Sequence, residues 1–103
     1  MENLHSKLAL ITGATSGIGE ALAHQFSKNG IRLILVGRRI KNLQKLARVL
    51  DVDTHILNID ISNRETVVEA LSNLPESFSD VDILVNNAGL ALGLASSAEG
   101  NLD

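Results

Sequence analysis

Three glycines and two hydroxyl side chains lie close together in the stretch TGATSGIGE. Gly13, Gly17 and Gly19 have the spacing G-x-x-x-G-x-G, with Thr15 and Ser16 between them. The first glycine permits a sharp exit from a strand, the second lets a pyrophosphate approach the backbone, and the third allows close packing of a helix on the sheet. The N–H groups and dipole of that helix favour an anion, and the two hydroxyls can add donors. The turn therefore predicts a dinucleotide phosphate site, although a turn that only connects two elements also fits the glycines alone. The P-loop pattern, which requires a lysine after the last glycine, is absent.

Two arginines, Arg38 and Arg39, follow about twenty residues after Gly19. In dinucleotide-binding folds an acidic residue at this distance bonds the ribose 2′-hydroxyl of NAD. A carboxylate there would repel a 2′-phosphate, whereas a guanidinium can bind it in bidentate fashion. The pair therefore favours NADP over NAD. The alternative is a solvated pair of charges, which is the weaker interpretation because cations are unfavourable at the start of a helix.

Polar residues also follow the third and fourth apolar segments of the chain. Asp60 follows the third, where its carboxylate can accept a hydrogen bond from an adenine amino group or simply close a turn. The fourth ends in Asn86, Asn87, Ala88 and Gly89. In open α/β sheets, ligands bind outside the carboxyl ends of the strands. Because all these groups of residues fall at such ends, we predict that they belong to one site.

Four short apolar segments, at residues 8–11, 31–36, 55–60 and 82–86, alternate with three segments of helical periodicity. Asn29-Gly30 predicts the end of the first helix, and a capping box predicts that the third begins at Ser62 and ends before Pro75. The predicted buried face of that third helix consists of Val67, Val68, Leu71 and Leu74. The predicted order of elements is β-α-β-α-β-α-β. Because strands that alternate with helices imply a parallel sheet, we predict one α/β domain.

These motifs resemble those of the short-chain dehydrogenase/reductase family. The resemblance rests on TGATSGIGE, NID and NNAG, while VGRR and LVNNAGLALG are similar to its NADP-dependent 3-hydroxy acid (serine-type) branch. It implies a three-layer Rossmann-like fold with strand order 3-2-1-4 and hydride transfer between NADP and an alcohol or carbonyl. It also implies the roles of the cofactor-binding residues: the pyrophosphate cradle of Gly13, Ala14, Thr15, Ser16, Gly17 and Ile18, followed by Gly19; Arg38 and Arg39 at the 2′-phosphate; Asp60 and Ile61 along the adenine; and Asn86, Asn87, Ala88 and Gly89 beside the cofactor and the central sheet.

The chain departs from the family in its catalytic residues. Family members use a serine and a Tyr-x-x-x-Lys pair, but this sequence of 103 residues contains no tyrosine. We therefore assign no catalytic residue and expect residues 1–103 to be the cofactor-binding N-terminal half of one Rossmann domain, inactive alone. The alternatives are a non-catalytic nucleotide-binding or interaction module, and a sugar-nucleotide epimerase or atypical reductase of the same fold.

The expected half fold leaves the fourth strand, with Ile83, Leu84 and Val85, as an uncovered edge. We therefore expect the chain to self-associate or to pair with a missing C-terminal half, and we expect residues 90–103 to be loosely ordered.

Composition argues against nucleic-acid-binding, membrane-spanning and metal-binding proteins. Hydrophobic residues make up 45% of the chain, which suits a folded core, and the two aromatic residues leave that core aliphatic. The net charge of −3 offers no general basic field for nucleic acid. No segment has the ~18 apolar residues that a membrane helix needs. The absence of cysteine excludes disulfides and thiolate metal sites and fits a reducing compartment, and His5, His24 and His55 are not spaced as a metal set. We therefore expect a cytoplasmic protein without a metal site.

Overall fold

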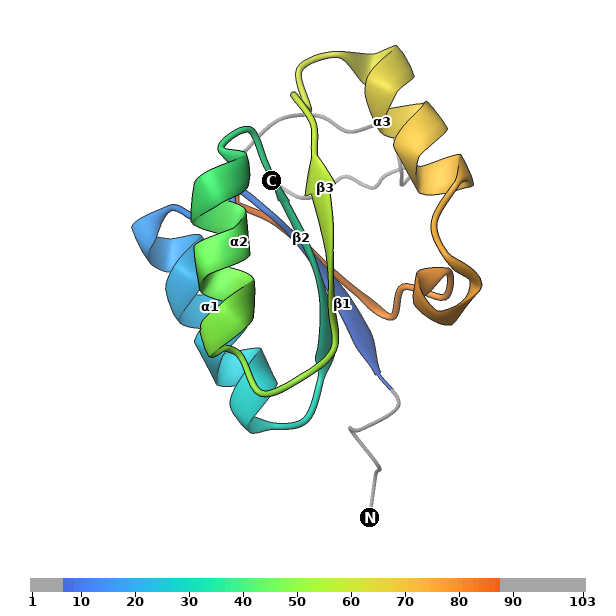
Figure 1. The fold of residues 1–103 in the computed structure, drawn as a ribbon. Coiled ribbons are helices and arrows are strands. Elements are labelled where there is room, and N and C mark those ends of the chain that lie inside the picture. Colours follow the sequence, from blue (N-terminus) through green and yellow to red (C-terminus); the bar gives the residue numbers. More distant parts are fainter. Residues whose placement is uncertain (1–6, 88–103) are drawn as a thin grey trace.

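Four parallel strands form one sheet in the order β3-β2-β1-β4 (Figure 1). The computed structural model describes residues 7–87, and its strands are β1 (Leu8–Thr12), β2 (Arg32–Gly37), β3 (Thr54–Asn58) and β4 (Ile83–Asn86). The predicted strand order and parallel pairing are confirmed. The third strand ends two residues earlier than predicted, which leaves Asp60 in the loop beyond it. The prediction for residues 90–103 lies outside the described residues.

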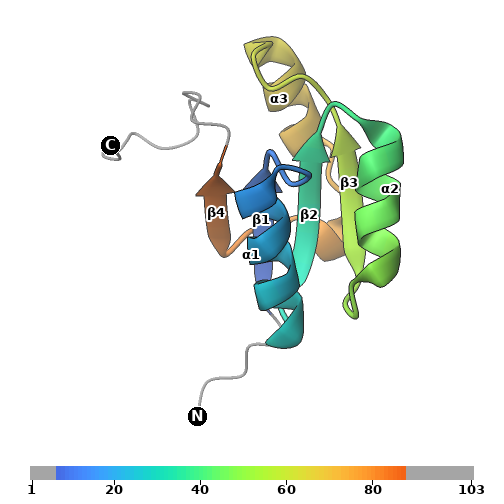
Figure 2. The same ribbon diagram turned by 90° about the vertical axis from the view of Figure 1, so that its left-hand side faces the viewer.

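Helices cover both faces of this sheet. The helices α1 (Gly17–Lys28) and α2 (Ile40–Val49) lie on one face, and α3 (Arg64–Ser72) lies on the other (Figure 2). A short 3-10 turn, η2 (Glu76–Phe78), connects α3 to β4. The molecule therefore has the three layers that the resemblance implies. Among the described residues, no helix has the length and apolar character to cross a membrane.

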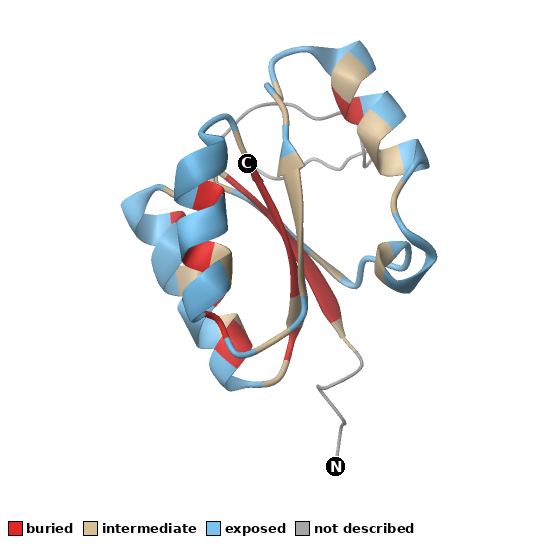
Figure 3. Cartoon of the chain, in the orientation of Figure 1, coloured by how far each residue is buried: buried red, intermediate tan, exposed pale blue. Residues whose placement is uncertain are grey.

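The two central strands, β1 and β2, carry the core of both layers. Consecutive strand residues point to opposite faces, so one apolar strand supplies two clusters. Ala9, Ile11, Leu33 and Leu35 pack toward α1 and α2, whereas Leu8, Leu10, Ile34 and Val36 pack toward α3. All eight are at most 3% exposed, and β1 and β2 appear as the buried centre of Figure 3. This buried frame fixes the carboxyl ends of the strands, where the predicted site lies.

The C-terminal end of α1 agrees with the sequence prediction, but the start of α3 does not. Asn29 ends α1, and Gly30 follows in the left-handed region with φ 76°, as expected for a helix stop. The predicted start at Ser62 is wrong. Asn63 is the N-cap of α3, and its side-chain oxygen accepts a hydrogen bond from the Thr66 N–H at 3.1 Å. Ser62 is instead held in a turn by the side-chain carboxylate of Asp60.

The buried face of α3 is narrower than predicted. Val67 is buried, and Leu71 and Leu74 are half-buried against the sheet. Val67 and Leu71 are four positions apart on one face of α3, and Leu74 follows just beyond the end of the helix. Val68 lies outside that face and is 52% exposed, so its predicted burial is wrong. Leu84 of β4, which pairs in register with Leu10 on the face that α3 covers, is 43% exposed. Part of this sheet face is therefore left uncovered by the described residues.

Candidate functional site

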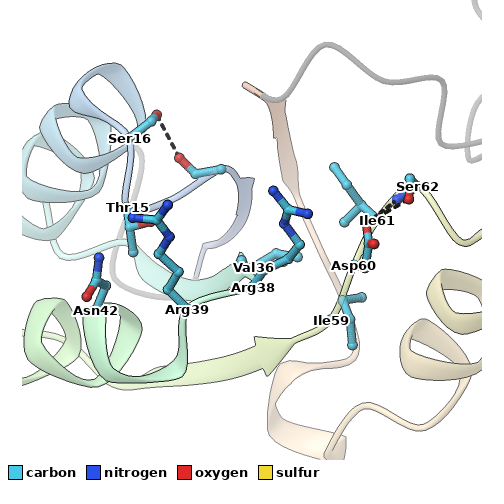
Figure 4. A pocket seen from close by; sticks show the side chains of 12 residues that line it. Thr15, Ser16, Val36, Arg38, Arg39, Asn42, Ile59, Asp60, Ile61 and Ser62 are labelled. Atoms are coloured by element: carbon cyan, nitrogen blue, oxygen red, sulfur yellow. Dashed lines mark hydrogen bonds between the residues drawn. The ribbon is translucent and has the colours of Figure 1, made fainter.

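A cavity of about 560 Å³ opens beyond the carboxyl ends of β1, β2 and β3 (Figure 4). The glycine turn, the arginine pair and the loop after β3 form its walls. Seven of the residues predicted from the sequence line it, namely Gly13, Thr15, Ser16, Arg38, Arg39, Asp60 and Ile61. Residues that are 48 positions apart in the chain therefore meet at one place, because parallel strands end at the same edge of a sheet.

The glycine turn is held closed by its own hydrogen bonds. Gly13 has φ 62°, a conformation that favours glycine. The hydroxyl of Ser16 donates to the Gly13 carbonyl at 2.8 Å and accepts from the Gly19 N–H at 3.2 Å. A Cβ on Gly19 would lie 2.2 Å from the Gly13 carbonyl oxygen. The third glycine thus permits close packing of α1 on the turn itself, where the sequence predicted close packing on the sheet.

Three backbone N–H groups of this turn remain available to an anion. The N–H groups of Ala14 and Ser16 donate to carbonyl oxygens within the protein. Those of Thr15, Gly17 and Ile18 make no hydrogen bond with any of residues 7–87. A Cβ on Gly17 would meet nothing within 4 Å, so the space in front of this glycine is open. The turn therefore presents a set of donors at the positive end of α1, which is the chemistry that binds phosphate.

The two asparagines after β4 hold the turn in place. The side-chain nitrogen of Asn87 donates to the Gly13 carbonyl at 3.2 Å and to the Ser16 hydroxyl at 2.5 Å. The hydroxyl of Thr12, at the end of β1, donates to the side-chain oxygen of Asn86 at 3.1 Å. Both asparagines thus join β4 to β1 and the turn, and neither lines the cavity. The other two predicted residues of this motif, at positions 88 and 89, lie outside the described residues.

Arg38 and Arg39 bring positive charge to the opposite wall. Arg39 is the N-cap of α2, and its side chain makes no capping hydrogen bond. Both side chains are exposed and line the cavity that the glycine turn also lines. Positive charge at a helix start is unfavourable for the helix, so this pair is not explained by helix stability. It fits a place where a phosphate group would be neutralised.

Asp60 closes a turn at the far end of the cavity. One of its carboxylate oxygens accepts the Ser62 hydroxyl at 2.8 Å and the Ser62 N–H at 3.0 Å. These hydrogen bonds, and then the positive charge of Arg38, hold the pKa of Asp60 below its ordinary value of 3.8. Asp60 is therefore a carboxylate at neutral pH. It closes a turn, which was one of the two roles that the sequence allowed for it. Its contact with an adenine remains a prediction.

Five lining residues were not predicted, namely Val36, Gly37, Asn42, Ile59 and Ser62. Val36 and Ile59 supply apolar wall next to the arginines and the carboxylate. Asn42 had a signal in the sequence, because it stands three positions after Arg39 and so shares its side of the helix. The described residues hold no group of three or more His, Cys, Asp or Glu side chains placed to bind a metal ion.

The cavity fits an adenine dinucleotide in its donors, its charge and its apolar wall. Backbone N–H groups suit a pyrophosphate, guanidinium groups suit a further phosphate, and half-buried Ile59 and Ile61 give an apolar wall for a base. Residues that offer all three kinds of contact line one cavity.

The family model described as short chain dehydrogenase matches residues 7–102 of this chain. Serine 3-dehydrogenase from Rhizobium radiobacter is 49% identical over 90 residues, which are 87% of this chain and 36% of that protein. NADP-dependent 3-hydroxy acid dehydrogenase YdfG from Escherichia coli (strain K12) is 40% identical over 96 residues, which are 93% of this chain and 39% of that protein. This chain therefore spans well under half the length of these relatives.

Solved structures agree with the sequence comparison. The crystal structure of serine dehydrogenase from Escherichia coli superposes with a TM-score of 0.75 at 44% identity, over 82% of this chain and 39% of that one. The closed form of serine dehydrogenase complexed with NADP+ superposes with a TM-score of 0.73 at 40% identity, over 78% of this chain and 32% of that one. On its matched length, its sheet order and its glycine turn, the chain belongs to the short-chain dehydrogenase/reductase family.

Proposed function

We propose that this chain is the NADP-binding part of an oxidoreductase that moves hydride between NADP and an alcohol or carbonyl. One observation carries the proposal. The glycine turn lines the same cavity as Arg38 and Arg39, and within residues 7–87 the N–H groups of Thr15 in this turn and of Gly17 and Ile18 just after it have no hydrogen-bond acceptor. The names of the relatives support the choice of cofactor, since one is an NADP-dependent dehydrogenase and one solved structure is a complex with NADP+.

Each wall of the cavity has a proposed task. The three N–H groups hold the pyrophosphate, and the arginines hold the 2′-phosphate that distinguishes NADP from NAD. Asp60 and Ile61 lie along the adenosine. Bound NADP supplies the hydride or accepts it, and the residues of this chain contribute binding and orientation only.

We propose that the chain has no turnover by itself. Its 103 residues contain no tyrosine to exchange a proton with the substrate. The relatives are more than twice as long as the part that this chain matches. We therefore propose that the catalytic groups and the substrate site lie in a C-terminal half that completes the domain. We also propose that the protein is cytoplasmic. A chain without that half is expected to associate with itself.

Titration with NADPH, followed by its fluorescence, tests the proposal. We expect saturable binding below millimolar concentration and weaker binding of NADH. The double variant Arg38→Ala/Arg39→Ala should lose most of the preference for NADPH. The control Lys41→Ala/Arg48→Ala removes the same positive charge from exposed positions of α2 and should keep it. No saturable signal at millimolar NADPH, or an equal loss in both double variants, would overturn the proposal.

A non-catalytic nucleotide-binding or interaction module is the second candidate. The complete absence of tyrosine from the sequence favours it if the native protein has this length. The intact mass of the native protein separates the two. A mass near 11.0 kDa supports the module, and a mass more than twice as large supports the dehydrogenase.

A further inference from the structure

The residues Asn29 and Gly30 at the end of α1 bring a side-chain amide next to an unhindered backbone nitrogen. The backbone nitrogen that follows an asparagine can attack the side-chain amide, and a side chain on the following residue hinders this attack. Asn29 is exposed, and Gly30 has no side chain. Asn29 is also the only asparagine in the sequence that a glycine follows. The pair that ends the helix therefore has the composition of a chemical modification site.

The folded turn holds both reacting groups in hydrogen bonds. The side-chain nitrogen of Asn29 donates to the Gln25 carbonyl at 2.9 Å, and the Gly30 N–H donates to the Ser27 carbonyl at 3.0 Å. Each group is thus directed at a carbonyl of α1 and not at the other group. The reaction requires that the last turn of α1 opens, and a helix end is where local opening costs least.

The end of α3 offers a matched comparison within the same chain. Asn73 ends α3 as Asn29 ends α1, and its side-chain nitrogen donates to the Glu69 carbonyl, also four residues earlier, at 2.8 Å. Both asparagines are exposed. Leu74 follows Asn73, and its N–H makes no hydrogen bond with any of residues 7–87. If hydrogen bonding of the nucleophile set the rate, Asn73 would react first. If the side chain at the following position sets it, Asn29 reacts first.

We propose that Asn29 is a site of spontaneous deamidation in the folded chain, and that the reaction proceeds when the last turn of α1 frays. The Gly30 nitrogen gives up its proton and bonds to the side-chain carbonyl carbon of Asn29, whose amide takes up a proton and leaves as ammonia. Water then opens the cyclic imide at either of its carbonyls. The products are an aspartate and an isoaspartate, in which the main chain runs through the former side chain and is longer by one carbon.

The modification weakens the junction between α1 and β2. A carboxylate at the C-terminal end of a helix is unfavourable. The isoaspartate also lengthens the chain between Ser27 and Ile31, which are both buried. The Ile31 N–H donates to the Phe26 carbonyl at 3.1 Å, so the added carbon disturbs a turn that is closed on both sides. Modified chains should therefore unfold at a lower temperature than unmodified ones.

Incubation of the chain in mildly alkaline buffer, followed by proteolysis and mass spectrometry, tests the proposal. We expect the mass gain of an amide that becomes a carboxyl at Asn29, and none at Asn73 over the same time. Low urea should leave the rate at Asn29 nearly unchanged, because fraying exposes little surface. The control Asn29→Gln keeps an amide on a longer side chain and should show no mass gain at this position. Thermal unfolding of the modified and unmodified fractions measures the effect on stability.

Three results would refute deamidation by fraying. They are equal modification of Asn29 and Asn73, a rate at Asn29 that rises steeply with low urea, and an Asn29 that stays intact in the folded chain while the urea-unfolded chain reacts. An unchanged unfolding temperature of the modified fraction would refute the effect on the junction of α1 and β2.

Discussion

At the scale of single residues, Ser16 shows how an expected ligand donor can be used up inside the protein. Its hydroxyl proton goes to the Gly13 carbonyl, and its oxygen accepts from the Gly19 N–H and from the Asn87 side chain. Ser16 is therefore a positioning residue that shapes the turn and caps α1. The hydroxyl of Thr15 has no such partner among the described residues, so it is the one that remains for a ligand.

Asp60 carries the pH dependence of the site. Because its pKa is lowered in the fold, its carboxylate adds to stability above the ordinary value of 3.8, and that contribution is lost as pH falls through the folded value. Asp60→Asn keeps an oxygen acceptor for Ser62 but removes the charge that faces Arg38. We expect the variant to be less stable than the unsubstituted chain at neutral pH, with the difference closing below about pH 4. Urea unfolding at a series of pH values measures this, and a difference that is the same at every pH would contradict it.

At the scale of elements, the glycine turn combines two glycines with different reasons for lacking a side chain. Gly19 is surrounded by backbone, with the Gly13 carbonyl oxygen 2.2 Å from its hypothetical Cβ. Gly17, two positions earlier, faces open space. The packing of α1 thus requires glycine at position 19. Among the described residues, no contact requires glycine at position 17, so a bound ligand is the remaining reason for it.

Substitution by alanine should separate these reasons. Gly19→Ala forces the turn or α1 to move, and we expect it to lower the free energy of unfolding by about 1–3 kcal/mol. Gly17→Ala should leave stability unchanged or slightly raised, because alanine favours the helix, yet weaken NADPH binding by crowding the pyrophosphate. Thermal unfolding and NADPH titration of both variants give the comparison. Full NADPH affinity in Gly17→Ala would show that the open space in front of this residue is not used.

The elements that sequence reasoning predicted are those with local causes. Four apolar runs and the glycine turn are encoded within a few residues each, and all of them are present. The start of α3 has two local solutions, a cap by Ser62 or by Asn63. The choice between them depends on Asp60, which captures Ser62 from the loop after β3. The exposure of Val68 likewise depends on how α3 is rotated against the sheet, which no local pattern specifies.

At the scale of the whole molecule, the fold explains why the cavity was only partly predictable. Thr15 lies in the turn before α1 and Asn42 lies on α2, and they share a wall only because the strand order sets α1 beside α2. Among the described residues, the same strand order leaves β4 paired on one side only, with β1. The residue before β4 is tied to β1, since Asp82 and Leu8 exchange hydrogen bonds at 2.8 and 2.9 Å. Within residues 7–87, no strand lies beside the other edge of β4.

This edge predicts association of the chain. Leu84 is 43% exposed on a strand that can accept another, which is the pattern that leads to edge pairing. We expect light scattering to show a mass that rises with concentration, and Leu84→Lys to shift the chain toward monomer because a charge on an edge strand opposes pairing. The control Val49→Lys adds the same charge at a residue of α2 that is 59% exposed, and should leave association unchanged. A monodisperse monomer of the unsubstituted chain would contradict the predicted association. Equal effects of both lysines would assign association to net charge and not to β4.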